Sequence, residues 1–379
     1  QGYSSAASDV YKRQVCNSAA IFTKNLVKSD TIYVTKKHLE NGTAQAVVVN
    51  SGNANACNPD GYEKAEKMCS LAADALGVDE NDVIVASTGV IGQPLPIEPI
   101  ASGIEKLKGT LSKDGGISAA EAIMTTDTVK KQWAVETVLD GKKVTIGGIA
   151  KGSGMIHINM GTTLSFVTTD AAISSEMLKS ALIEAADVSY NMVSVDGDTS
   201  TNDTLAIMAS GYAGNKEITE KNDDYKTFTA VLTDAFKKVA KKLAKDGEGA
   251  TKLLICKVDG AKDDKSAKII SKSIICSSLV KAAMFGADAN CGRILCAIGY
   301  SGAKTDVKRI DVSYKSAKGE ILVCKDGNGL VFDEDKAKEI LLEDEIEILV
   351  KLGDGNASAE AYGCDLTYDY VKINGDYRT

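Results

Sequence analysis

The sequence contains very little histidine: two residues, His38 and His157, in a chain of 379. A Ser-His-Asp or Cys-His catalytic site would have to use one of them, and a histidine-rich zinc site is excluded. If the protein is an enzyme, we therefore expect its general base to be another group. A free α-amino group is a candidate, because its pKa lies near ~8.

Other features that the sequence lacks exclude whole classes of binding partner. No apolar run approaches the length of a membrane span, so we expect a soluble protein with no membrane partner. There is no block of basic residues and the net charge is −8, so we expect no nucleic-acid partner. The nine cysteines include no C-x-x-C pair, which indicates reduced thiols in a cytoplasmic protein.

Two glycine-rich stretches look superficially like phosphate-binding loops, KGSGM at 151–155 and DGEGATK at 246–252. Neither has the spacing of a P-loop or of a dinucleotide-binding fingerprint, so nucleotide binding is rejected as the main function. The stretch VDGDTSTND at 195–203 carries three carboxylates. Its glycine comes too early for a calcium loop and the closing glutamate is missing, which favours a structural loop and no metal site.

Helices and strands alternate along the chain, with hairpins and turn-rich loops, which favours mixed α/β sheets over a simple parallel sheet. Apolar periodicity predicts helices over 62–76, 98–111, 117–124, 174–187, 228–243, 265–285 and 335–342. Strand patterns are found at 20–23, 31–34, 46–49, 82–86, 133–138, 143–149, 164–167, 205–209, 250–258, 294–298, 310–314, 321–324 and 346–352. The stretch 193–203 is expected to be a polar loop.

The first residues show no sequence pattern that continues into the rest of the chain. SSAASDVYKRQ at 4–14 has no periodicity and matches the conceptual translation of a sequencing adapter. We expect residues 1–14 to be an assembly artefact on a truncated gene, with the genuine chain beginning near Val15, and exclude them from reasoning about the fold.

The rest of the chain is organised around the stretch KGSGMIHINMGTTLSFVTTD at 151–170. Its Gly161–Thr162 bond lies just before an apolar strand, with Lys151 upstream. One interpretation is a loop followed by a strand. The other is a threonine that cleaves its own chain and then serves as an N-terminal nucleophile. These residues alone leave both interpretations open.

Five long motifs together resemble the glutamate N-acetyltransferase/ornithine acetyltransferase family of arginine biosynthesis: KGSGMIHINMGTTLSFVTTD, VDGDTSTNDT, DGEGATK, LVKAAMFGADANCGRIL and DLTYDYVKINGDYRT. The resemblance runs from about Ile21 to Thr379. It implies self-cleavage at Gly161–Thr162, which gives an alpha fragment, 15–161, and a beta fragment, 162–379. The Thr162 hydroxyl would attack the preceding carbonyl, and the freed amine would then act as its base.

The resemblance also implies the reaction and the fold. The acetyl group of N2-acetyl-L-ornithine moves to Thr162 and then to L-glutamate, giving ornithine and N-acetylglutamate. No cofactor is expected, and acetyl-coenzyme A is left open as a second acetyl donor. The fold is that of a self-cleaving N-terminal-threonine nucleophile, related to the DmpA type: two packed sheets between helix layers, plus a smaller α/β domain. The two fragments are expected to form a heterotetramer with two copies of each.

The resemblance also implies the site residues, which are assigned by their positions in the family's motifs. Thr88 and Gly89 are expected to form the oxyanion hole. The substrate ligands are expected to be Thr125, Lys151, Thr162, Glu248, Asn374 and Thr379. Lys151 suits a substrate carboxylate and Glu248 an amino group.

The chain departs from the family pattern at three positions. Gly161 stands where alanine is usual, Ile158 where proline is common and Cys291 where tryptophan is usual. Two alternatives remain: a related N-terminal-nucleophile aminopeptidase, whose acceptor is water, and a non-catalytic binding protein on the same fold.

Overall fold

The structure is a computed structural model that describes residues 14–112, 114–157 and 163–375. The chain divides into two compact units, which are described separately. Among the described residues, the first consists of those within 14–152, 163–191 and 199–239, and the second of those within 153–157, 192–198 and 240–375. The predicted boundary between two fragments at 161 and 162 lies outside the described residues.

A six-stranded mixed sheet forms the first unit's larger layer. Its strands, in spatial order, are β2 (Thr43–Ala44), β1 (Cys16–Phe22), β10 (Thr204–Ala209), β8 (Leu164–Thr169), β6 (Lys142–Lys151) and β5 (Lys131–Leu139). β10 and β8 run parallel, and the other neighbours are antiparallel. The strands predicted at 133–138 and 143–149 form the β5–β6 hairpin, whose turn is Asp140 and Gly141. Both residues have a positive φ, +48° and +70°, as a tight two-residue hairpin turn requires.

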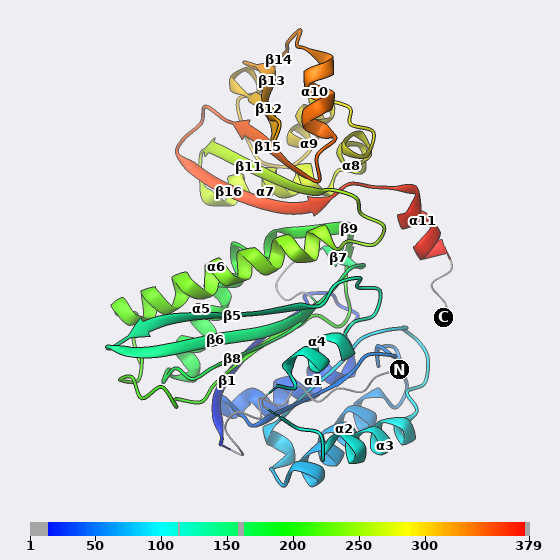
Figure 1. Cartoon of the computed structure of the whole chain (residues 1–379), viewed down its shortest axis with the longest axis vertical. Helices are drawn as coiled ribbons and strands as arrows, with labels where there is room; N and C mark the ends of the chain where they lie inside the picture. Colours follow the sequence, from blue (N-terminus) through cyan, green and yellow to red (C-terminus); the bar gives the residue numbers. More distant parts are fainter. Residues whose placement is uncertain (1–13, 113, 158–162, 376–379) are drawn as a thin grey trace. The chain divides into compact units, whose positions relative to one another are not determined.

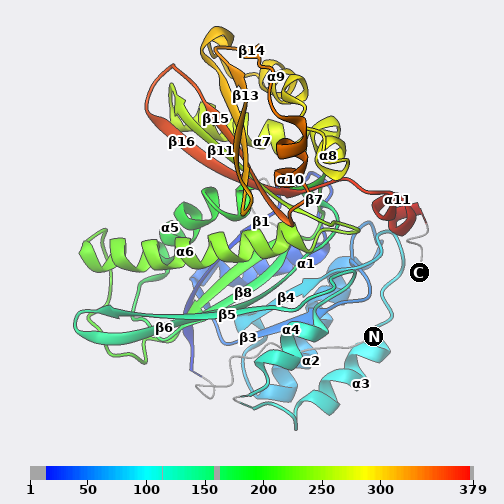
Figure 2. The ribbon, with the colours of Figure 1, turned by 45° about the horizontal axis from the view of Figure 1, so that its top comes forward.

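A two-stranded parallel sheet, β3 (Ala46–Asn50) and β4 (Val83–Ser87), packs face to face on the six-stranded sheet. Helices α2 (Gly61–Leu76) and α3 (Ile97–Leu107) cover its outer face, and α5 (Ser175–Asp187) and α6 (Asp223–Lys245) cover the far face of the larger sheet (Figures 1 and 2). The short helix α4 (Gly116–Ala122) adds to the core between the sheets. The predicted pair of packed sheets between helix layers is confirmed.

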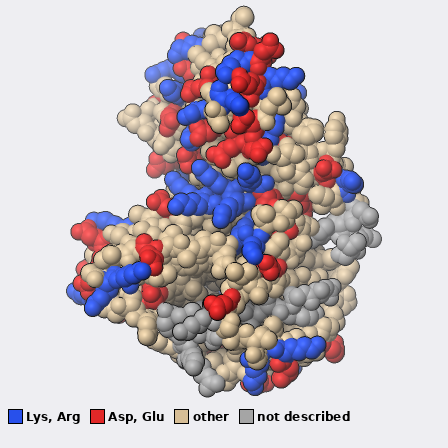
Figure 3. Space-filling model, viewed as in Figure 1, with Lys and Arg blue, Asp and Glu red and all other residues tan. Residues whose placement is uncertain are grey.

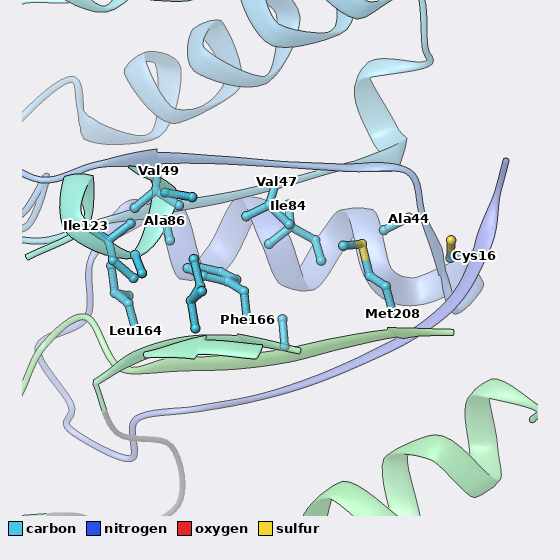
Figure 4. Packing of buried hydrophobic residues seen from close by; sticks show 14 residues of the cluster. Cys16, Ala44, Val47, Val49, Ile84, Ala86, Ile123, Leu164, Phe166 and Met208 are labelled. Atoms are coloured by element: carbon cyan, nitrogen blue, oxygen red, sulfur yellow. The ribbon is translucent and has the colours of Figure 1, made fainter. Parts of the chain in front are cut away.

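The core between the two sheets follows from side-chain alternation along the strands (Figure 4). Val47 and Val49 of β3 point toward Phe166 of β8 and Met208 of β10. The intervening Ala46 and the alternate valines of both strands pack instead against α2 and α3. Both faces of β3 and β4 are therefore buried, which explains why these two strands read as uninterrupted apolar runs.

The strand expected at 31–34 is wrong, because these residues belong to helix α1 (Asp30–His38). Ser29 caps the helix by accepting the Thr31 N–H. The Thr35 hydroxyl accepts the Val85 N–H and donates to the Val85 carbonyl, at 2.9 and 2.7 Å. The helix thus satisfies the open edge of β4, a tertiary contact that outweighs the strand preference of β-branched residues.

The second unit contains an eight-stranded mixed sheet, in the order β14 (Asn328–Gly329), β13 (Gly319–Lys325), β12 (Asp311–Ser316), β15 (Glu345–Lys351), β11 (Leu253–Ala261), β16 (Ala357–Cys364), β9 (Val193–Thr199) and β7 (Ile156–His157). Its helices are α7 (Asp264–Cys276), α8 (Ser278–Phe285), α9 (Cys291–Gly299), α10 (Glu334–Leu341) and α11 (Tyr368–Gly375). The predicted smaller α/β domain corresponds to this unit.

Three further expectations fail in this unit. The helix predicted over 265–285 is two helices, because the backbone of Ser277 is extended and its side chain caps α8. The strand predicted at 294–298 is part of α9, which Asn290 caps. The polar stretch at 193–203 begins as strand β9, whose first residues pair with Tyr362 and Gly363 of β16. In each case a cap or a pairing partner decides the local structure.

Where charged side chains lie on the visible surface, basic and acidic ones are mostly interspersed (Figure 3). Basic side chains gather over the C-terminal half of α6, whose sequence carries lysines at 237, 238, 241, 242 and 245. The apolar face of the same helix is buried, as its periodicity predicts. No helix in the described part of the chain is long and apolar enough to cross a membrane.

The core between the sheets gives the first testable prediction. Replacing the buried Phe166 with alanine should lower the free energy of unfolding by about 3–5 kcal/mol, since a cavity replaces the ring. Denaturant titration measures this change. Val138, which is 62% exposed, serves as the control: Val138→Ala should change stability by less than about 0.5 kcal/mol. Equal effects of the two substitutions would contradict the assignment of this core.

Candidate active site

Lys151 is a buried lysine at the end of β6, only 7% exposed. Its Nζ donates to the hydroxyl of Thr88 at 3.0 Å and to that of Thr125 at 2.9 Å. Thr88 directly follows β4, and Thr125 lies in the loop after α4. The structure thus brings together three predicted site residues from distant segments of the first unit. An ammonium can only donate, so both hydroxyls accept from it and keep their own O–H for another acceptor.

Gly89 forms a turn that only glycine can form comfortably. Its φ is +130°, and a Cβ built there would lie 2.6 Å from the carbonyl carbon of Gly52 and 2.7 Å from the nitrogen of Asn53. The preceding Thr88 N–H donates to the carbonyl of Asn50 at 2.9 Å. The absence of a side chain therefore lets the predicted oxyanion turn lie directly against the loop after β3.

Asp127, which the sequence motifs did not reveal, lies beside the candidate site residues Thr125 and Lys151. Its carboxylate accepts from Lys131 at 2.7 Å, from the Gly152 N–H at 2.6 Å and from the Thr125 N–H at 3.2 Å. Burial acts to raise the pKa of Asp127, but Lys151, Lys131 and these hydrogen bonds outweigh it and lower the pKa below its ordinary value. Asp127 therefore carries a buried negative charge that balances the lysines and holds the loop bearing Thr125.

Sheet register places a second buried carboxyl group near the start of β8. Lys151 of β6 pairs with Leu164 of β8, which pairs in turn with Thr204 of β10. Asp203, just before β10, accepts the Thr163 N–H at 2.7 Å. Burial raises the pKa of Asp203 to about 7, although Thr163, Ser200 and Lys151 act to lower it. Of the three carboxylates at 195–203, Asp203 is therefore the one that the structure buries against the backbone at the start of β8.

Glu248 and Asn374 meet within the second unit. Asn374 Nδ2 donates to the Glu248 carboxylate at 2.8 Å, and Glu248 is itself buried. The Glu248 N–H donates to the carbonyl of Ser153 at 3.0 Å. A Cβ on Gly154 would lie 2.3 Å from the Glu248 carboxylate. The absence of a side chain at Gly154 thus makes room for the Glu248 carboxylate.

Both histidines lie in structural environments. His38 Nδ1 lies 2.8 Å from the carbonyl of Val83. His157 contacts the Ser194 hydroxyl at 3.2 Å and the Cys276 sulfur at 3.3 Å. Burial, followed by the charge of Lys272, lowers the pKa of His157 to about 4, so its imidazole is neutral at pH 7.

Three of the predicted site residues, Gly161, Thr162 and Thr379, lie outside the described residues. The others fall into the two groups above: Thr88, Gly89, Thr125 and Lys151 in the first unit, and Glu248 and Asn374 in the second. Within the described ranges, no three or more histidine, cysteine or acidic side chains are grouped so as to hold a metal ion.

Comparison with known proteins shows which family the chain belongs to. Residues 6–379 match the ArgJ family. The chain belongs to the ArgJ family. The arginine biosynthesis bifunctional protein ArgJ 1 of Clostridium acetobutylicum is 51% identical over 371 residues, which are 98% of this chain and 91% of that protein. The arginine biosynthesis bifunctional protein ArgJ of Bacillus subtilis is 48% identical over 364 residues, 96% of this chain and 88% of that protein.

A crystal structure of the arginine biosynthesis bifunctional protein ArgJ from Bacillus halodurans is also similar. It superimposes with a TM-score of 0.53 at 45% sequence identity, over 55% of this chain and 97% of that chain. The family expected from the five motifs is therefore confirmed for this ArgJ-family chain. The roles of its individual site residues remain predictions.

The buried ion pair of the site gives a stability prediction. The side chains of Lys131 and Asp127 are both fully buried. Lys131→Met should lower the free energy of unfolding by about 3–5 kcal/mol, because the buried Asp127 carboxylate loses the ammonium group that donates to it directly. The neighbouring Lys130 makes an equally short ion pair with Glu121, but both side chains are about half exposed. Lys130→Met should therefore cost no more than about 1 kcal/mol. Denaturant titration of both variants distinguishes them, and equal losses would contradict the account.

Asp203 gives a prediction about pH. Its pKa is about 7 in the folded chain against an ordinary 3.8, so between these values the folded state binds a proton that the unfolded state has lost. This contribution to stability is fully present below about pH 4 and is lost as the pH rises to about 7. Asp203→Asn should lack it. The difference in unfolding free energy between wild type and variant should fall over this window, and parallel pH profiles would refute the assignment.

Proposed function

We propose that this chain is an acetyltransferase that moves the acetyl group of N2-acetyl-L-ornithine to L-glutamate in arginine biosynthesis. Membership of the ArgJ family and the names of its relatives support this function. The observation that carries it is the Lys151 ammonium bound to the hydroxyls of Thr88 and Thr125. This arrangement leaves hydroxyl protons available to a substrate oxygen beside the turn that only glycine permits.

The proposal begins with cleavage of the chain at Gly161–Thr162. The Thr162 hydroxyl attacks the Gly161 carbonyl, and the acyl group moves from nitrogen to oxygen to form an ester. Water hydrolyses the ester, which leaves a carboxylate on Gly161 and a free amine on Thr162. The Bacillus halodurans chain is matched over 97% of its length by 55% of this chain, as a separate fragment would be.

In the transfer itself, the new amine takes the proton from the Thr162 hydroxyl, whose oxygen attacks the acetyl carbonyl of N-acetylornithine. The resulting oxyanion accepts hydrogen bonds from Thr88 and Gly89. The ornithine amine leaves with a proton, and the acetyl group remains as an ester on Thr162. The amino group of glutamate then attacks the ester carbonyl and loses a proton. The bond to the Thr162 oxygen breaks, the oxygen regains its proton, and N-acetylglutamate leaves.

The charges of the proposed ligands match the charged groups of the two substrates. Lys151 suits the α-carboxylate that N-acetylornithine and glutamate share. Glu248, with Asn374 beside it, suits a substrate ammonium group. Thr125 and Thr379 complete the proposed set of ligands. No cofactor takes part, and acetyl-coenzyme A is a candidate second donor, in keeping with the word bifunctional in the relatives' names.

The same proposal includes the assembly of the enzyme and its location in the cell. The alpha and beta fragments stay associated, as a heterotetramer with two of each, and the enzyme acts in the cytoplasm. The alternative is an aminopeptidase with the same self-cleavage, and the acceptor distinguishes the two: glutamate for the transferase and water for the peptidase.

Thr162→Ala tests the proposal. Purified wild-type protein should appear as two fragments by intact mass spectrometry, and the variant as one uncleaved chain without activity. Thr110→Ala, at an exposed threonine, is the matched control and should behave as wild type. Wild-type protein should also move labelled acetyl from N-acetylornithine to glutamate. An intact wild-type chain with full activity, or label that reaches only water, would overturn the proposal.

A further inference from the structure

We propose that the loop at 200–204 positions both halves of the site in the first unit, with Asn202 and Asp203 as its positioning residues. Asn202 fixes the turn that carries Thr88 and Gly89. Asp203 fixes the backbone that follows Thr162. The inference deepens the proposed function and rests on it.

Asn202 clamps the peptide that leads into the Thr88–Gly89 turn. Its side-chain amide, in a residue only 5% exposed, donates to the carbonyl of Ser87 at 2.7 Å and to that of Ala54 at 2.6 Å. The Ser87 carbonyl and the Thr88 N–H belong to one planar peptide group. Since the Thr88 N–H is held by Asn50, both polar ends of that peptide are fixed. A rotation of the turn would break one of these bonds.

The second bond of Asn202 acts on the other side of the same turn. Ala54 follows the Gly52–Asn53 backbone, against which Gly89 is packed without room for a Cβ. The Ala54 N–H donates to the carbonyl of Val90 at 2.9 Å, just beyond the turn. One amide group therefore holds both the oxyanion turn and the backbone that supports it.

Asp203 and Thr204 hold Thr163 in an unusual conformation. The φ of Thr163 is +69°, a region that β-branched residues rarely adopt. Asp203 accepts its N–H at 2.7 Å, and the Thr204 N–H donates to its carbonyl at 2.8 Å. Asp203 and Thr204 therefore fix the backbone of Thr163, the first described residue after the proposed nucleophile. Backbone held in sparsely populated regions is typical of functional sites.

A purely structural role for these two residues predicts a loss of stability alone. A positioning role predicts a loss of turnover at a given stability, because a small displacement of either half misaligns the attacking oxygen and the oxyanion donors. The experiment therefore needs variants that lose equivalent hydrogen bonds elsewhere in the first unit.

The chain offers matched controls. Asn215 is also 5% exposed, and its side-chain amide donates to the carbonyls of Ala172 and Lys216 at 3.1 and 2.8 Å. Asp170 accepts the Thr145 N–H at 2.7 Å, the same bond that Asp203 makes with Thr163. Asn202→Ala is compared with Asn215→Ala, and Asp203→Ala with Asp170→Ala, by steady-state acetyl transfer, unfolding free energy and the cleaved fraction.

For Asn202→Ala we expect kcat to fall about 10–100-fold with less than about a 3-fold change in KM, while Asn215→Ala keeps wild-type turnover. Asn202→Asp keeps the side chain's size but loses its N–H donors, so it should be impaired like Asn202→Ala. Asp203→Ala should slow both cleavage and transfer. Asp203→Asn should restore both, because its amide oxygen can still accept the Thr163 N–H.

Wild-type protein is assayed first, so that the two proposals fail separately. No transfer by cleaved wild-type protein would sink the proposed function, and the cleavage rates would still test Asp203. With an active wild type, normal turnover in both Asn202 variants would overturn the role of Asn202. Asp203→Asn as slow as Asp203→Ala would overturn that of Asp203, since its acid group rather than its acceptor would then be required.

Discussion

A buried ammonium group that must be hydrogen-bonded and balanced in charge organises the site in the first unit. Lys151 enters the interior as the last residue of β6, where an unpaired charge would be very costly. The hydroxyls of Thr88 and Thr125 accept from it, and Asp127 supplies the balancing charge. Meeting these needs draws the loops after β4 and α4 to the end of β6.

The packed sheets make this convergence possible. Register aligns the end of β6 with the starts of β8 and β10, and β4 lies on the facing sheet. Polar loops from four strands therefore meet at one edge of a rigid apolar core, where small displacements are resisted. Loops carried by a rigid scaffold in this way are the usual place for catalytic groups.

The sequence predicted the strands with uninterrupted or alternating apolar residues and the helices with clear periodicity, such as α2 and α6. It failed at α1, where Thr35 satisfies the edge of β4, and at α9, which depends on the Asn290 cap. Five long motifs were enough to predict the family. They did not reveal Asp127 or Asn202, because the importance of these residues lies in backbone groups that are distant in sequence and become neighbours only after folding.

The most direct test of the account is to identify the residue that carries the acetyl group between N-acetylornithine and glutamate. Protein incubated with acetyl-labelled N-acetylornithine, without glutamate, is quenched and its peptides are sequenced by mass spectrometry. The account predicts one labelled acetyl group on the residue-162 side chain of a fragment that begins there, and its loss when glutamate is added. Label on another residue, or a chain still joined at 161 and 162 in active protein, would contradict it.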